Sequence, residues 1–207
     1  MHRVVLMSRA YKQSSRRVAE RTRAEEVDPD NQLVWRQNLK RLESELIRDS
    51  ILAASGRLDF HSYGPPVPVT KPVSGLSMVD TESSRNGHNR RSVYIFARRV
   101  YPLKFLEIFD SPIMAINCSR RLNSTTVLQS FSQLNSDFVI HAARDAATHI
   151  RDSSGEEPPD VVKIGYRTII GRVPTENEQK DCLLFLIEQE ASYRQEGQVE
   201  KAKWLAT

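Results

Sequence analysis

The chain has 207 residues, with 30 Lys and Arg against 26 Asp and Glu, a net charge of +4 and 39% hydrophobic residues. Its longest apolar run, Cys182 to Ile187, is far shorter than the roughly 20 residues that span a bilayer, and no secretory h-region follows Met1. Two cysteines exclude a disulfide scaffold and a four-cysteine zinc site, and neither a CxxCH haem motif nor a glycine-rich nucleotide motif occurs.

The first third of the chain predicts helices. Residues 4–15 are typical of a partly buried helix, and the charged stretch that follows ends in a turn at residues 28–31. A long helix is predicted over 32–55, with Gly56 as its stop. Its expected core stripe consists of Trp35, Leu39, Leu42, Leu46 and Ala53. A polar stripe runs beside it and consists of Arg41, Glu45, Arg48 and Asp49.

The middle of the chain changes character. Residues 64–88 are rich in proline and glycine and predict a long loop. Residues 92–97 (SVYIFA) are β-branched and aromatic, which predicts a strand, and a short helix is expected over 102–109.

The C-terminal part predicts further helices over 127–134, 137–152 and 161–170. Thr175 and Glu178 form a capping box that opens another helix, whose expected apolar face is Cys182, Leu183, Leu186 and Ala191. The expected buried face of the 137–152 helix is Val139, Ala142, Ala143, Ala146 and Ile150. Gly197 precedes a last amphipathic piece over 199–207.

The predicted fold is therefore all-α, an irregular multi-helix domain with a long Pro/Gly-rich loop and at most a minor β element. We expect residues 1–207 to form a single domain with N-terminal helices (1–60), the loop (61–91), and a strand-like segment with C-terminal helices (92–207).

Three sets of residues invite a chemical interpretation. His141, Asp145 and His149 follow one another at four-residue steps, but the two imidazoles lie about 12 Å apart along a helix, too far to share one metal ion. Cys118 next to arginines could be an activated thiol, but a structural thiol is favoured. Four arginine pairs and the +5 charge of residues 61–121 suit an anionic polymer, yet no nucleic-acid-binding signature accompanies them.

Short sequence pieces spread over nearly the whole chain together resemble one family. They include Asp28–Asn31 leading to Arg41–Asp49, Arg91–Tyr94, Phe109–Pro112 leading to Cys118–Arg121, Ser124–Thr125 leading to Asn135, and Gly171–Thr175 with Glu178. In order and spacing this series is similar to the planctomycete cytochrome-c-associated domain of unknown function (family fifteen fifty-three).

The resemblance implies a setting rather than a mechanism. Members of this family are large, exported, multi-domain proteins, so the resemblance implies an extracytoplasmic location for the full-length protein. It also places any haem in another region and none in this chain, which carries no signal peptide of its own. Family members continue upstream and downstream of these residues, so we expect this chain to be a fragment of the domain.

The favoured function is a non-catalytic binding or assembly domain of a cytochrome-c-linked or polysaccharide-processing protein, with other domains of that protein or an anionic glycan as partner. One alternative is a polysaccharide-acting enzyme, whose carboxylates would come from Glu43, Glu45, Asp49, Glu107 and Asp110. Another is a nucleic-acid-binding protein, which the absence of motifs disfavours. The candidate polar cluster, expected to converge in space, is Arg41, Glu45, Arg48, Asp49, Arg91, Cys118, Arg121, Ser124, Thr125 and Asn135.

Overall fold

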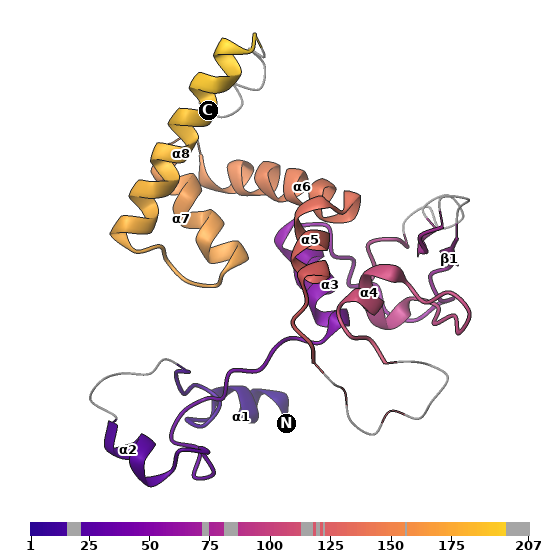
Figure 1. Ribbon diagram of the computed structural model, residues 1–207, viewed down its shortest axis with the longest axis vertical. Coiled ribbons are helices and arrows are strands. Elements are labelled where there is room, and N and C mark those ends of the chain that lie inside the picture. Colours follow the sequence, from indigo (N-terminus) through magenta and orange to yellow (C-terminus); the bar gives the residue numbers. More distant parts are fainter. Residues whose placement is uncertain are drawn as a thin grey trace. The chain divides into compact units, whose positions relative to one another are not determined.

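A computed structural model describes residues 1–15, 22–71, 75–80, 87–112, 118, 121, 123–155 and 157–197, without the side chain of Thr22. The chain divides into two compact units, Met1–Leu42 and Glu43–Thr207. Helices dominate the described residues, and the described β structure is one two-stranded sheet and two isolated bridges (Figure 1). The predicted all-α class with a minor β element is thereby confirmed.

The first unit contains two short helices, α1 (His2–Met7) and α2 (Thr22–Val27). The prediction that the first helix is partly buried and extends toward Ser14 is wrong. The helix ends at Met7, because Ser8 adopts an extended conformation, and none of its residues is buried.

The predicted helix over 32–55 forms only in its second half, as α3 (Ser44–Ala54). The preceding segment is a hydrogen-bonded loop. The Asp28 carboxylate accepts from the backbone N–H groups of Gln32 and Leu33 at 2.9 and 2.7 Å, and Asn31 has a positive φ of 54°. These side-chain bonds offer the backbone an alternative to the helix.

The second unit contains the other helices. After α3 come a 3-10 turn, η2 (Ser92–Tyr94), and helices α4 (Lys104–Ile108), α5 (Val127–Asn135), α6 (Asp137–Ser154), α7 (Pro158–Ile169) and α8 (Glu176–Gln195). Helices α5 and α6 confirm their predicted positions, and Ser136 caps α6 by accepting from the Val139 N–H at 3.3 Å. The Thr175–Glu178 capping box opens α8 as predicted. The expected amphipathic piece at 199–207 lies outside the described residues.

The β structure lies elsewhere than predicted. Strands β1 (Val69–Thr70) and β2 (Met78–Val79) pair antiparallel within the Pro/Gly-rich segment. The predicted strand over 92–97 begins instead as η2, and its only ladder contact in the described chain is a bridge between Val67 and Ile95. Side chains from α3 hold Ser92, as shown below, so the segment turns rather than extends.

The apolar core of the second unit is small. Its buried members are Leu52, Val67, Val69, Leu103, Phe109, Ala142, Ala146, Ile150 and Val162. Phe105 links α4 to this core, with ring centroids 4.9 Å from Phe109 and 5.1 Å from Phe138 of α6. Three members of the predicted α6 face are buried, whereas Ala143 is exposed.

The predicted core stripe of the 32–55 helix is wrong. Leu39 and Leu46 are exposed, and the residues of α3 that are buried are Ser44, Arg48 and Leu52. The helix thus turns a partly polar face inward, at four-residue steps.

Candidate functional site

Arg48 is the centre of a polar network on the buried face of α3. Only 2% of its surface is exposed. Its Nη1 donates to the Arg90 carbonyl at 2.9 Å and to Ser92 Oγ at 3.2 Å, and its Nη2 donates to the His88 carbonyl at 2.6 Å. Its guanidinium also lies over the Phe138 ring, 5.6 Å from the centroid. Arg48 therefore ties α3 to the segment that leads into η2.

Asp49 completes this connection and balances the buried charge. Its carboxylate accepts from the Ser92 N–H at 2.8 Å and from Ser92 Oγ at 2.7 Å, and it lies 3.6 Å from the Arg48 guanidinium. Burial lowers the pKa of Arg48 to about 10, and the Asp49 charge partly offsets that shift. Arg48 remains a cation at neutral pH, so it forms an ion pair with Asp49, and its hydrogen bonds go to two carbonyl oxygens and to Ser92 Oγ.

Two neighbouring arginines anchor the Pro/Gly-rich loop. Arg90 is buried and donates to the carbonyls of Pro65 and Tyr63 at 3.0 and 2.5 Å, with its guanidinium 4.0 Å from the Tyr94 ring centroid. Arg91 donates to Ser62 Oγ at 3.0 Å. Arginine suits this role because its planar fork of donors can satisfy several carbonyls at once.

Glu45, one turn before Asp49 on α3, carries a separate ion pair. Arg121 donates to both Glu45 carboxylate oxygens, at 2.6 and 3.0 Å, and also lies 3.2 Å from Glu43. Burial raises the pKa of Glu45, but hydrogen bonds from Arg121 and Ser44 outweigh it and leave the pKa below its usual value. Glu43 and Glu45 both contact Arg121 Nη1, so the two contacting carboxylate oxygens lie within about 6 Å of each other. This separation is near the distance between the two carboxyl groups of retaining glycosidases. The Arg121 cation between them helps to lower the pKa of Glu45, which is the opposite of the shift that a general acid needs.

A second polar cluster lies between α4 and α5. The Asp110 carboxylate accepts from the Ser124 N–H and Oγ at 2.8 and 2.7 Å. The buried Gln129 donates to the Ile108 carbonyl at 3.0 Å. These bonds connect the end of α4 to the start of α5 and use the Ser124 hydroxyl structurally.

The ten predicted site residues are thus only partly brought together. Glu45, Arg48 and Asp49 lie within one turn of α3. Arg121 pairs with Glu45, and Ser92, which follows Arg91, bonds to Arg48 and Asp49. Ser124 belongs to the Asp110 cluster, Thr125 is exposed beside it, and Asn135 donates to the Phe131 carbonyl of its own helix. Cys118 is exposed, and Arg41 lies in the first unit.

Sequence reasoning missed three buried residues near α3: Arg90 and Ser92, which bond to Arg48, and Ser44, which donates to Glu45. Arg90 carried a signal, because Arg90 and Arg91 form one of the four arginine pairs in the sequence. The serines carried none, because a buried serine becomes apparent only through the partners that the fold supplies.

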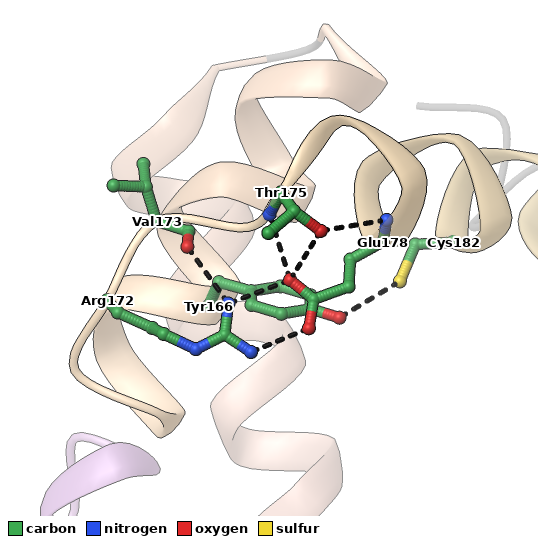
Figure 2. A network of polar contacts seen from close by, with 6 residues as sticks. All are labelled: Tyr166, Arg172, Val173, Thr175, Glu178 and Cys182. Carbon is green, nitrogen blue, oxygen red and sulfur yellow. Dashed lines mark hydrogen bonds and ion pairs between the residues drawn. The ribbon is translucent and has the colours of Figure 1, made fainter. Parts of the chain in front are cut away.

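A further polar network joins α7 to α8 (Figure 2). Arg172 donates to both carboxylate oxygens of Glu178, at 2.7 and 2.6 Å, and the same carboxylate also accepts from the Thr175 N–H and hydroxyl. The Tyr166 ring lies beside this pair, and its hydroxyl is 3.9 Å from Cys182 Sγ. The hydrogen bonds from Arg172, then those from Thr175, lower the pKa of Glu178 to about 2. This network fixes the turn between the two helices.

These two helices, together with α6, line a largely apolar, partly open cavity of about 340 Å³. Its walls come from α6, α7 and α8, and they include Ile150, Val162, Ile169, Phe185 and Leu186. Ile169 is 63% exposed and Phe185 is 58% exposed, so two large apolar side chains stand at its mouth.

The described residues hold no group of three or more metal-ligating side chains. Asp145, from the spaced histidine series, instead pairs with Arg57 at 2.9 Å. Within the same described part of the chain, no helix is long and apolar enough to cross a membrane.

These observations define a mostly helical protein in which buried arginines of the α3 region hydrogen-bond to the loops around them. A model of the PSD1 family, described as proteins of unknown function (DUF1553), matches residues 1–186. The chain therefore belongs to the PSD1 (DUF1553) family. Comparisons with curated proteins and with solved structures found no significant match.

Proposed function

We propose that this chain is a non-catalytic assembly domain that binds another domain of its parent protein through the cavity between α6, α7 and α8. The observation that carries the proposal is the apolar mouth of that cavity, where Ile169 and Phe185 are more than half exposed. Apolar side chains that rim a concave surface are typical of a protein–protein contact.

The use of charge in the second unit supports a role without catalysis. Asp49, Asp110, Glu45 and Glu178 each accept hydrogen bonds from structural partners in their own unit. General acid catalysis at a glycosidic bond needs a carboxyl group with a raised pKa, whereas the pKa values of Glu45 and Glu178 are lowered.

The arginines favour a protein partner over an anionic glycan. Arg48 and Arg90 each donate to two backbone carbonyls, and Arg121 pairs with two glutamates. A binding site for sulfate or carboxylate groups needs donors that are directed at the ligand.

The setting of the proposal rests on the resemblance described above. In it, the parent is a large, exported planctomycete protein linked to a cytochrome-c-like region or to polysaccharide processing. The haem would belong to that other region.

The test is calorimetric titration of the chain with the other domains of the parent protein, each produced separately. We expect one of them to bind and Phe185→Glu to weaken that binding at least tenfold, because it places a charge at the apolar mouth. Phe131→Glu is the matched control: Phe131 lies on α5 and is 61% exposed, and its substitution should leave binding unchanged.

Three results would contradict the proposal. One is that no domain binds, and another is that both phenylalanine variants bind alike. The third is a thermal stabilisation of the chain by sulfated or acidic polysaccharides that fades with salt, which would identify a glycan as the partner instead.

A further inference from the structure

Helix α8 carries a stripe of six residues separated by alternating steps of four and three: Glu176, Lys180, Leu183, Ile187, Glu190 and Arg194. On an ideal helix these residues fall within a sector about 80° wide. Alternating three- and four-residue spacing is the pattern of the a and d positions of a coiled coil. In the stripe of α8, the two central positions are apolar and the outer four are charged.

The stripe faces away from α7. Leu183 and Ile187 line a shallow hollow together with other side chains of α8 alone, whereas Cys182, Phe185 and Leu186 line the cavity shared with α6 and α7. Ile187 is 62% exposed and the adjacent Leu184 is 49% exposed. Large apolar side chains exposed on the outer face of a helix, in addition to those that line its inner cavity, suit a second neighbour on that outer side.

The charges along the stripe are self-complementary in one orientation. If a second α8 runs antiparallel with the two helices crossing at position 185, Leu183 of one copy faces Ile187 of the other. Lys180 then faces Glu190, and Glu176 faces Arg194, so every charged residue of the stripe meets an opposite charge. This pairing also places each a position opposite a d position, as antiparallel helix pairs require.

Parallel pairing has the opposite consequence. It would place Lys180 against Lys180 and Glu190 against Glu190, and like charges at facing positions are destabilising. We therefore propose that a second copy of this chain is the partner of this stripe, in a two-fold symmetric, antiparallel α8–α8 contact.

The contact is small. Its apolar centre consists of Leu183 and Ile187 from each copy, with Leu184 at the edge, which places it at the weak end of specific interfaces. We expect association with a dissociation constant on the order of 10–100 μM. The ion pair that Glu190 makes with Arg194 of its own helix keeps both charges on the stripe in the single copy.

The test is sedimentation velocity of the whole chain over roughly 1 μM to 1 mM, a range that brackets the expected constant. We expect the wild-type chain to shift from one copy to two. Lys180→Glu and Glu190→Lys should each weaken association at least tenfold, because each places two pairs of like charges face to face. An equimolar mixture of the two variants should associate as the wild type does, because each facing pair then combines a Glu with a Lys.

Rescue by mixing is the decisive readout, since a variant that only unfolds cannot be restored by a second damaged chain. Phe185→Glu serves as the control for the other face and should leave self-association unchanged. Because that variant tests the proposed function, the two proposals can fail separately. A single copy at every concentration, or variants that associate normally, would overturn the inference.

Discussion

Around α3, charged side chains lie inside the protein, whereas along α7 and α8 large apolar side chains lie on its surface. Arg48 is 2% exposed, while Ile187 is 62% exposed. In the α3 region, buried polar groups hydrogen-bond to neighbouring loops, so the stability of this region depends on those hydrogen bonds. The region formed by α7 and α8 leaves apolar area in water, which leaves surface for partners.

The largest expected effect comes from breaking the α3 network. Arg48→Met should lower the free energy of unfolding by about 3–5 kcal/mol, because it removes the donor from the carbonyls of Arg90 and His88 and leaves Asp49 without its cation. Urea unfolding measures the change. Arg99→Met is the control: Arg99 is exposed, and its loss should cost less than about 0.5 kcal/mol. Equal effects of the two variants would show that the network adds no stability.

Two glycines in the left-handed region of φ, one after α3 and one after α7, allow the packing of the two regions to be compared directly. Gly56 ends α3 with φ +70°, and an added Cβ would lie 3.1 Å from the His149 ring. Gly171 follows α7 with φ +76° and open space around it. Backbone strain alone costs about 1–2 kcal/mol, so we expect Gly171→Ala to lose about that much and Gly56→Ala to lose more.

Thermal unfolding of both glycine variants measures this difference. His149→Ala in the Gly56→Ala background should recover the excess, because it removes the crowding but not the strain. A smaller loss for Gly56→Ala than for Gly171→Ala would contradict the packing of His149 against the end of α3.

The ion pair between α7 and α8 should be visible in the pH dependence of stability. The pKa of Glu178 is lowered to about 2, so its contribution is complete above the ordinary glutamate pKa of about 4.3 and is lost as pH falls toward 2. Glu178→Gln should therefore flatten the decline of melting temperature between about pH 4.5 and 2. Glu188→Gln, at an exposed position of α8, should leave the decline as it is. Parallel curves for all three proteins would exclude a contribution from the pair.

The smallest expected effect is on the outer face of α8. Ile187→Gln should change the free energy of unfolding of a single copy by less than about 0.5 kcal/mol, because the side chain is already largely in water. Denaturant unfolding at low protein concentration measures it. A loss greater than about 1 kcal/mol would mean that Ile187 packs within its own chain.

Local signals in the sequence determined much of the helical part of the fold. Gly56 as the stop of α3, Ser136 as the cap of α6 and the Thr175–Glu178 box at the start of α8 each act through neighbouring residues. The periodic face of α6 correctly identified Ala142, Ala146 and Ile150 as buried. Such signals are readable because capping and periodicity involve residues within one or two turns.

Only the tertiary structure decided the rest. The segment before α3 is a loop because the Asp28 side chain competes with the helix for backbone N–H groups, so the predicted stripe of residues 35–46 does not form. The turn at Ser92 and the burial of Arg48 depend on contacts between segments more than 40 residues apart. Arginine is usually found on the surface. Arg48 is buried because the loop at residues 88–92 brings carbonyls and a serine to its donors. A sequence lists the donors, but the fold supplies the acceptors, and a buried polar group is stable only where both meet.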